Sequence, residues 1–298
     1  MAPRQTILIA GATGSVGGAA ALALSKGGAR VVLLGRSARK LNAKADSMRE
    51  ALSDIGIDNP SGDIATLTVD FSDLESVRAA AEEALCRFPA IDRLVLSVGA
   101  LVQNGPHVLP SGHEVMFATN VMGPFLFTQL LVERLQQSDG LVLHVIAPFC
   151  EKVDWDDLES IDHHRSMTAF NRTKTCNRVI AGELARRYTG KISSVAFDPT
   201  FVIDKSDPDL KKRWPTGFTG LAWRIMAALR AKSPAGAGEP IAKLMLSQRD
   251  RRSINGALFV LDQRANEADM AMNDEVLGAR LWERLEVLTE APSGRPSV

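Results

Sequence analysis

The chain has 298 residues, of which 45% are hydrophobic, and this is enough apolar sequence to bury one large core. Lysine plus arginine and aspartate plus glutamate both number 35, so the formal charge is zero and no basic surface for nucleic acid or anionic lipid is predicted. The three cysteines show no CxxC spacing, so neither a disulfide framework nor a metal site is predicted. We therefore expect a small-molecule partner, no nucleic acid, and a reducing, cytoplasmic location.

Membrane segments are not expected either. The first strand-like run begins at Thr6, which leaves no room for the charged and apolar regions of a secretion signal. The apolar stretches 121–132 and 140–149 are shorter than the roughly 20 residues of a membrane-spanning helix. The sequence thus predicts a soluble protein with no membrane partner.

Strand-like and helix-like segments alternate along most of the chain. Runs rich in β-branched residues, typical of buried strands, occupy residues 6–10, 30–34, 65–69, 93–97, 141–146 and 192–197. Apolar residues at helical spacing fill residues 17–26, 74–88, 123–136 and 169–188. This alternation predicts right-handed βαβ crossovers and hence an α/β fold of the Rossmann type, a doubly wound parallel sheet with helices on both faces.

We expect a single domain over residues 1–298, because no linker or internal repeat divides the chain. Residues 204–234 break the alternation with charge, proline and apolar side chains, which indicates a small helical lid over a substrate. The apolar content of this lid favours a bulky, apolar small molecule. The tail from about residue 291 to 298 is expected to be disordered.

A glycine-rich stretch joins the first predicted strand to the first predicted helix. Gly11, Gly14 and Gly17 fall in the run ILIAGATGSVGG, residues 7–18. Glycine lets the backbone approach a pyrophosphate closely, and the free amides and dipole of the helix N-terminus favour its negative charge. A tight turn without a ligand would use the same residues, but the strand–turn–helix context favours nucleotide binding.

Arg36 stands where the second predicted strand ends, about 20 residues after the glycine turn. At this place an acidic side chain would bind the ribose hydroxyls of NAD. A guanidinium group can instead grip a 2′-phosphate through two parallel hydrogen bonds, so the sequence favours NADP(H) over NAD(H). The alternative is a solvated arginine in a loop.

Further stretches, together with the glycine turn, resemble the short-chain dehydrogenase/reductase superfamily and its retinol-dehydrogenase-like branch. They are VDFSDL at 69–74, SGHE at 111–114 with FATN at 117–120, AFNRTKTCN at 169–177, and residues 233–260. The resemblance implies that Asp70 contacts adenine and that Asn120 belongs to the active site. It also implies that Lys174 and the residue four positions before it share the helix face turned to the nicotinamide ribose.

The same resemblance implies a set of cofactor contacts and an assembly. Expected to contact NADP(H) are Gly11, Thr13, Gly14, Ser15, Val16, Gly17, Arg36, Ser37, Asp70, Phe71, Ser97, Gly99, Lys174 and Pro199. The resemblance also implies that the chain forms a homodimer or homotetramer, through the helices that start near Gly123 and Ala169.

The pattern breaks at the two residues that carry the superfamily's proton chemistry. Phe170 stands where the tyrosine would be, and Ala147 stands where the serine would be. A benzene ring cannot exchange a proton, and loss of a general acid typically costs about 10²- to 10⁴-fold in rate. Tyr188, the only tyrosine, lies on the same predicted helix roughly 27 Å further along. After the sixth strand, Pro199 is followed by Thr200 in place of the usual glycine.

Side chains that could replace the missing acid lie in the connection before the altered helix. They are Cys150, Glu151, Asp154, Asp156, Asp157, Asp162, His163 and His164. The two histidines are attractive because imidazole titrates near neutral pH, but an acidic, hydrophilic connection is more often a solvated surface loop. Cys150 is interpreted as a small buried thiol. The pocket floor is expected to be apolar, lined by Ala147, Phe170, Phe149 and Phe201.

Two functions from different classes fit these residues. The first is an NADP(H)-dependent oxidoreductase, or an enzyme repurposed for imine reduction, cyclisation or isomerisation, that acts on an apolar small molecule without the usual proton relay. Imine reduction suits the site because an iminium already carries its proton. The second is a catalytically silent module that binds NADP(H) or supports dimerisation. A purely structural protein would leave the glycine turn and Arg36 unexplained.

Overall fold

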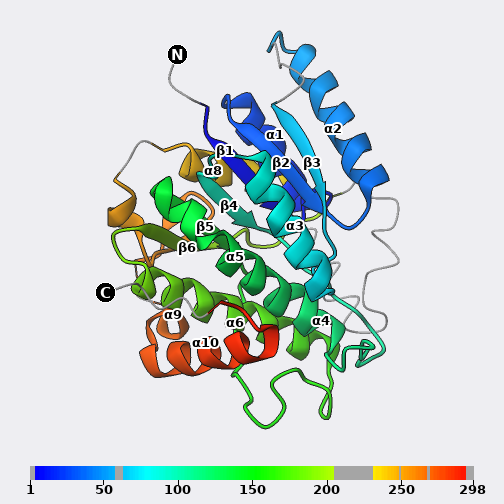
Figure 1. Cartoon of the computed structure of the whole chain (residues 1–298), viewed down its shortest axis with the longest axis vertical. Coiled ribbons are helices and arrows are strands. Elements are labelled where there is room, and N and C mark those ends of the chain that lie inside the picture. The colour runs from blue at the N-terminus through cyan, green and yellow to red at the C-terminus, as the bar shows by residue number, and fades with distance from the viewer. Residues whose placement is uncertain (1–3, 58–62, 205–230, 248–249, 267–268, 293–298) are drawn as a thin grey trace.

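A computed structural model describes residues 4–57, 63–204, 231–247, 250–266 and 269–292. Its core is one sheet with the strand order β3-β2-β1-β4-β5-β6-β7-β8 (Figure 1). The strands are β1 (Thr6–Ala10), β2 (Arg30–Gly35), β3 (Ile64–Thr68), β4 (Arg93–Leu96), β5 (Gly140–Val145), β6 (Ile192–Asp198), β7 (Leu258–Val260) and β8 (Gln263–Arg264). Strands β1 to β7 run parallel and β8 pairs antiparallel with β7. The predicted doubly wound α/β fold is therefore confirmed.

The strand order shows where a ligand can enter. The chain proceeds from β1 to β2 and β3 on one side and then returns to place β4 on the other side of β1. Ile7 of β1 pairs with Val31 of β2 and with Arg93 of β4, so the order reverses at this strand. In open α/β sheets, ligands bind in the crevice outside the carboxyl ends of the strands at such a reversal.

Helices cover both faces of the sheet. They are α1 (Ser15–Lys26), α2 (Ala38–Ser53), α3 (Leu74–Arg87), α4 (Val115–Phe117), η1 (Ala118–Met122), α5 (Gly123–Gln137), α6 (Ser166–Arg187), α8 (Pro234–Met245), η3 (Arg251–Ile254), α9 (Met270–Asn273) and α10 (Glu275–Thr289). Apolar residues of α1, α2 and α8 pack on one face, and those of α3, α5, α6 and α10 pack on the other. Leu8 and Ile9 of β1 belong to different clusters, because successive strand side chains point to opposite faces.

The predicted strands and helices agree closely with this structure. Each of the six predicted strands matches one of β1 to β6 to within a residue, and the four predicted helices are α1, α3, α5 and α6. Two long helices, α2 and α10, were not predicted. The expected lid at 204–234 and the expected disordered tail at 291–298 fall mostly outside the described residues.

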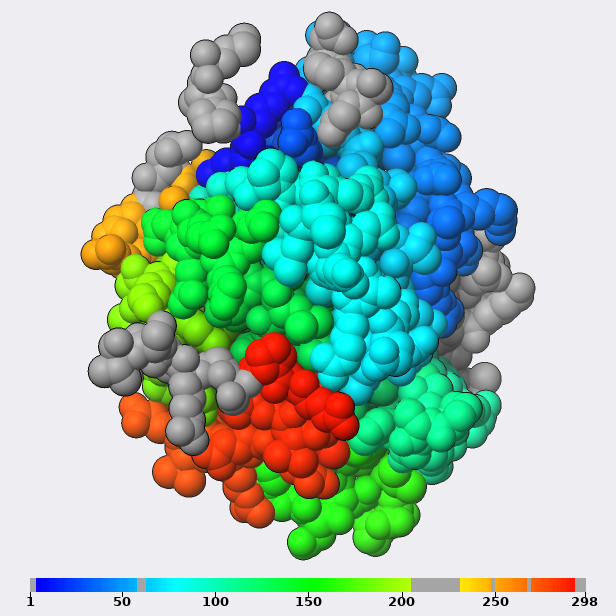
Figure 2. Space-filling model, in the orientation of Figure 1, coloured from blue at the N-terminus to red at the C-terminus, as the bar shows by residue number. Residues whose placement is uncertain are grey.

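The C-terminal helices close over α5 and α6. Trp282 of α10 packs edge-on against Phe125 of α5, with ring centroids 5.0 Å apart. A Cβ added to Gly182 of α6 would lie 2.0 Å from the carbonyl oxygen of Met272 in α9, so glycine is what permits this close approach. In Figure 2 the red α10 forms part of the outer surface next to the cyan α3. The outward side of α5 and α6 is thus partly covered by the chain's own C-terminal part.

Within the described part of the chain, one helical run is long and apolar enough to span a membrane by length and composition alone. It passes through α4, η1 and α5 over Val115–Gln137, and is longer than the apolar stretch 121–132 noted in the sequence. In the structure 83% of its most apolar window is buried inside the molecule. The run therefore packs as a core helix against the sheet.

Candidate active site

The glycine turn brings backbone segments into contact at the carboxyl end of β1. Gly11 has a φ of +79°, a left-handed conformation that glycine adopts without strain. A Cβ on Gly11 would lie 2.8 Å from the carbonyl oxygen of Ser97, and one on Gly17 would lie 2.5 Å from the carbonyl oxygen of Gly11. Side chains are therefore excluded here, and the amides at the N-terminus of α1 can approach an anionic group.

The other predicted contacts of the turn lie around it. Gly14 is the N-cap of α1, and Ser15 and Val16 are its first two residues. Thr13 lies beside the end of β2, because a Cβ on Gly35 would be 3.7 Å from the Thr13 hydroxyl oxygen. The turn thus extends from the end of β1 to the end of β2.

Arg36 follows β2 directly and is exposed. Among the residues that the structure describes, none forms a hydrogen bond or an ion pair with its guanidinium group. The neighbouring Ser37 is the N-cap of α2, where its hydroxyl accepts the backbone amide of Lys40 over 3.4 Å. Arg36 is thus held between a strand and a capped helix while its charge stays available to a ligand.

Asp70 and Phe71 follow β3 and have different surroundings. The Asp70 carboxylate accepts hydrogen bonds from the backbone amide of Ser72 over 3.0 Å and from its hydroxyl over 2.7 Å. Phe71 is 4% exposed and packs against Phe127, with ring centroids 5.7 Å apart. The Phe71 side chain belongs to the core, so a cofactor contact at this residue would have to come from its backbone.

Asn120 ties the loop after β4 to helix α6. It lies in the π-helical turn η1 and is fully buried. Its side-chain oxygen accepts the amide of Ala100 over 2.7 Å, and its nitrogen donates to the Ala100 carbonyl over 2.9 Å and to the Thr173 hydroxyl over 3.1 Å. Thr173 in turn donates to the carbonyl of Phe170 over 2.7 Å. Asn120 therefore fixes this loop against the helix that carries Lys174.

Lys174 reaches the carboxyl ends of β4 and β5. Its ammonium group donates to the carbonyl of Val98 over 2.9 Å and to that of Val145 over 3.3 Å. The ring centroid of Phe170, one turn earlier on α6, lies 5.6 Å from the Lys174 nitrogen. Burial lowers the pKa of Lys174 from 10.5 to about 8, because surroundings of low dielectric disfavour the charged form.

Ser97 and Gly99 place the loop after β4 between the glycine turn and Lys174. The backbone amide of Ser97 donates to the carbonyl of Ala10 at the end of β1, over 3.1 Å. A Cβ on Gly99 would lie 3.4 Å from the Lys174 nitrogen. The structure thus brings the turn, the loop and the lysine together at one edge of the sheet.

Ala147 and Phe170 supply no polar group to this edge. Ala147 lies two residues after β5, and Phe170 lies on α6, one turn before Lys174. Both are half-buried. The carbonyl of Ala147 accepts a hydrogen bond from the guanidinium of Arg178 over 2.6 Å. Neither side chain can donate or accept a proton.

The chain bends sharply after β6. Pro199 is buried, and Thr200 has a φ of +60°, which is uncommon for a β-branched residue. The amide of Thr200 donates to the Asp198 carboxylate over 2.7 Å and so supports the bend. Thr200 therefore takes the left-handed conformation that glycine would adopt here without strain.

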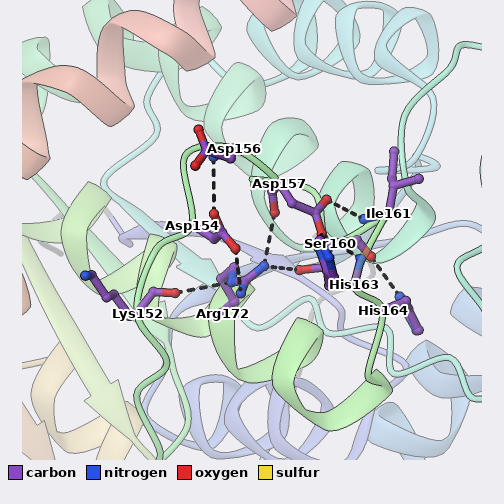
Figure 3. A network of polar contacts seen from close by, with 9 residues as sticks. All are labelled: Lys152, Asp154, Asp156, Asp157, Ser160, Ile161, His163, His164 and Arg172. Atoms are coloured by element: carbon purple, nitrogen blue, oxygen red, sulfur yellow. Dashed lines mark hydrogen bonds and ion pairs between the residues drawn. The ribbon is translucent and has the colours of Figure 1, made fainter.

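The connection before α6 is a hydrogen-bonded network around Arg172 and Asp157 (Figure 3). Arg172 donates to the carbonyls of Lys152 and Asp157 over 3.2 and 3.0 Å. It also donates to the hydroxyl of Ser160 over 2.7 Å. The Asp157 carboxylate accepts backbone amides, including that of Ile161 over 2.7 Å. Asp157 therefore holds the loop and is not free to act as an acid.

Some of the remaining candidates for a replacement acid are exposed to solvent, and others are hydrogen-bonded within the loop. The side chain of His163 is 88% exposed. Cys150 is exposed as well, so its interpretation as a buried thiol is wrong, whereas Cys176 on α6 is buried. His164 is half-buried, and its Nδ1 lies 3.0 Å from the carbonyl oxygen of Ser160. Of the two histidines, His164 has the more buried side chain.

A buried histidine beside Lys174 was not among the predicted residues. His144 lies in β5, and burial followed by the charge of Lys174 lowers its pKa to about 3, so the imidazole is neutral. Its Nε2 has no hydrogen-bond partner within the described part of the chain. The alternation of β5 gives the signal, because His144 shares its face with Val142, which packs in the same cluster as residues of α6.

A cavity of about 580 Å³ lies between the connection before α6 and α10. Trp155 and Arg280 line it, with the guanidinium carbon 4.0 Å from the ring centroid. Ala147, Phe170 and Lys174 are not among its lining residues. The cavity is therefore separate from the candidate active site.

A doubly wound sheet with a glycine turn at the strand reversal defines a dinucleotide-binding α/β protein. The lysine at the ends of β4 and β5 and the buried asparagine of η1 lie at the same edge of the sheet as this turn. Residues 5–152 match the model of the short chain dehydrogenase family. The chain belongs to that family, and retinol dehydrogenases are among its relatives.

Three relatives illustrate the range of the resemblance. A Streptomyces protein (strain C5) named for daunorubicin C-13 ketoreductase activity, DnrU, is 28% identical over 284 residues, which are 94% of this chain and 91% of the relative. Retinol dehydrogenase 14 of Mus musculus is 32% identical over 193 residues, or 62% of this chain and 57% of the relative. Retinol dehydrogenase 12 of Mus musculus is 26% identical over 285 residues, or 94% and 84%.

Solved structures agree with the fold at low sequence identity. An uncharacterised protein from Mycobacterium paratuberculosis superposes with a TM-score of 0.70 and 22% identity, covering 98% of this chain and 95% of that one. A short chain dehydrogenase of Shigella flexneri 2a, complexed with NADP, gives a TM-score of 0.64 and 20% identity, with coverages of 87% and 97%. Both confirm the Rossmann-type architecture.

Proposed function

We propose that the chain is an NADP(H)-dependent oxidoreductase that acts on a bulky apolar small molecule without the serine–tyrosine proton relay of its family. The observation that carries this proposal is the placement of Lys174. Its buried ammonium bonds the carbonyls of Val98 and Val145 at the strand ends, on the same edge as the glycine turn. The glycine turn offers backbone without side chains, and Lys174 offers a cation. Both suit the binding of an anionic dinucleotide.

Arg36 is the reason to prefer NADP(H) over NAD(H). Its guanidinium follows β2, is exposed, and has no partner within the described residues. A 2′-phosphate would provide the oxygens for a charge-assisted, bidentate contact, whereas a ribose diol offers a weaker one. The NADP complex of the Shigella flexneri structure lends further support.

The chemistry of the proposed reaction divides between cofactor and chain. When bound, NADPH supplies a hydride. An ammonium group has three donors, two of which Lys174 gives to backbone carbonyls, so one remains for a ribose hydroxyl. Ala147 and Phe170 shape an apolar wall that positions a substrate but gives it no proton. Imine reduction, cyclisation or isomerisation suit such a wall, because positioning carries more of their barrier.

The names of the relatives support redox chemistry on a small molecule. They include a daunorubicin C-13 ketoreductase and retinol dehydrogenases, so alcohol–carbonyl interconversion is the reaction shared by these names. The direct test is to follow NADPH absorbance with a panel of ketones, aldehydes and imines. Consumption of NADPH with any member supports the enzyme. No consumption across the panel, with NADPH bound, contradicts it.

Restoring the two hydroxyls tests the altered site. We expect Phe170→Tyr with Ala147→Ser to raise carbonyl reduction above the wild-type rate, because the tyrosine hydroxyl adds a general acid beside Lys174. The matched control is Phe170→Leu, which changes the side chain without adding a hydroxyl. A double variant that binds NADPH but stays at the wild-type rate would show that the site differs from its family by more than two hydroxyls.

The second candidate function is a catalytically silent NADP(H)-binding module. It is favoured by the same apolar pair, Ala147 and Phe170, which could simply fill volume in a protein that no longer catalyses. The two functions predict the same NADPH affinity. They differ in turnover, so the substrate panel separates them.

A further inference from the structure

Ser166 lies on the same face of α6 as Phe170 and Lys174. The three residues are spaced by four, and residues four apart on a helix have Cβ atoms about 5–6 Å from each other. Because Lys174 reaches the carboxyl ends of β4 and β5, this face is the one turned towards the candidate active site. Ser166, the first residue of α6, therefore lies one helical turn before Phe170.

His164 is the hydrogen-bond partner of that hydroxyl. Its Nε2 lies 3.4 Å from the Ser166 oxygen. Its Nδ1 lies 3.0 Å from the carbonyl oxygen of Ser160 (Figure 3). A carbonyl oxygen can only accept, so Nδ1 carries a hydrogen and Nε2 of the neutral imidazole accepts from Ser166. In the imidazolium form Nε2 donates to the Ser166 oxygen, and the hydroxyl hydrogen is then free to point to another acceptor.

The charged neighbours of His164 include carboxyl groups on a second loop. Burial raises the pKa of Glu114 at the start of α4, although backbone hydrogen bonds and the charge of His164 oppose this. The Glu114 amide donates to Glu159 over 2.8 Å, and Glu159 also lies 3.0 Å from Nδ1 of His113. Glu159 thus joins the loops after β4 and β5.

We propose that Ser166 is the proton donor of this enzyme and that His164 returns a proton to it. This relay rests on the oxidoreductase function proposed above. When bound, NADPH would supply the hydride to the substrate's carbonyl carbon, and the π electron pair would then rest on the carbonyl oxygen. That oxygen takes the hydroxyl proton of Ser166, while Ser166 takes the Nε2 proton of protonated His164. The products are the alcohol, NADP⁺ and neutral His164, which solvent reprotonates.

The test compares a substrate that needs a proton with one that does not. An apolar ketone needs both hydride and proton, whereas a quaternary N-alkylated iminium of similar size needs hydride alone. We expect Ser166→Ala to lower ketone reduction by about 10²-fold or more, the usual contribution of a general acid, and to leave iminium reduction near the wild-type rate. Ser166→Thr, which keeps the hydroxyl, should retain most of the ketone activity.

The histidine is tested with a matched pair of variants. His164→Asn keeps a donor for the Ser160 carbonyl but cannot deliver a proton, so ketone reduction should fall as in Ser166→Ala. His163→Asn changes the exposed neighbour and should have no effect. NADPH affinity, measured by fluorescence titration, should be the same in all variants and shows that each is folded.

Several results would overturn the relay. Unchanged ketone reduction in Ser166→Ala is one, and an equal loss with ketone and iminium is another, because it indicates a disturbed site. A wild-type protein that reduces the iminium but not the ketone keeps the proposed function and removes the relay. A wild-type protein that binds NADPH and turns over neither substrate refutes the proposed function, and the relay falls with it.

Discussion

Lys174 is a buried cation whose charge is compensated by backbone carbonyls rather than by a carboxylate. Its pKa of about 8 lies below the 10.5 of the free side chain. Between these values the unfolded chain binds more protons than the folded one, so the free energy of unfolding rises with pH across this window. The stability that is present above pH 10.5 is lost as the pH falls through 8. Relative to Lys174→Met, the wild type should gain about 1–3 kcal/mol from pH 8 to 10.5. Urea unfolding at several pH values measures this, and a constant difference would contradict it.

Arg36 should set the preference between the two nicotinamide cofactors. In Arg36→Ala, NADPH affinity is expected to fall by about tenfold or more, since a hydrogen bond to a charged group contributes roughly 1.5–3 kcal/mol. NADH affinity should change little, because its ribose carries no 2′-phosphate. Nicotinamide fluorescence titrations with both cofactors decide this. Arg39→Ala serves as the charge-matched control, because Arg39 is an exposed arginine in the first turn of α2. Equal losses for NADPH and NADH would assign Arg36 another role.

Some site residues could be placed from the sequence and others could not. The positions of the glycines and of Lys174 in the fold could be predicted, because their spacing along a strand–turn–helix and along one helix fixes their geometry. The burial of Cys150 was misjudged because it lies in a connection, where periodicity carries no signal. The alternation of β5 indicates which face His144 shares, but its proximity to Lys174 was missed because it arises from the packing of α6 on the sheet.

The helices and strands show the same division. Parallel strands buried on both faces are continuous apolar runs, which is why β1 to β6 were predicted closely. Helix α2 is mostly polar and buries only a narrow stripe, Leu41, Ala45, Met48 and Leu52. The connection before α6 was expected to be a solvated surface loop. Arg172 orders it through hydrogen bonds that the local sequence pattern does not predict.

The position of α9 and α10 bears on assembly. A homodimer or homotetramer through α5 and α6 remains a prediction, and Trp282 and Met272 now cover part of both helices. We therefore expect an interface that uses α5 and α6 only where α9 and α10 leave them free, and a subunit contact too small to resist dilution. Size-exclusion chromatography with light scattering should show a mass that falls towards 32.2 kDa as the protein is diluted. A tetramer that persists at high dilution would contradict this.

Different segments of the chain carry the two parts of the proposed function, cofactor binding and proton delivery. The groups expected to bind the dinucleotide lie mainly between Gly11 and Gly99, whereas Ala147, Ser166 and Phe170 lie around β5 and the start of α6. Changes in the second segment can therefore alter proton delivery while the first still binds its cofactor. The cytoplasmic location and the absence of nucleic-acid and membrane partners remain predictions from charge and composition.

Isothermal titration calorimetry with the full chain tests most directly whether nucleotide binding has been kept. NADPH and NADH are titrated separately into the same protein at equal ionic strength. We predict saturable binding of NADPH with one site per chain and weaker binding of NADH. Heats no larger than those of dilution for both nucleotides would contradict the account.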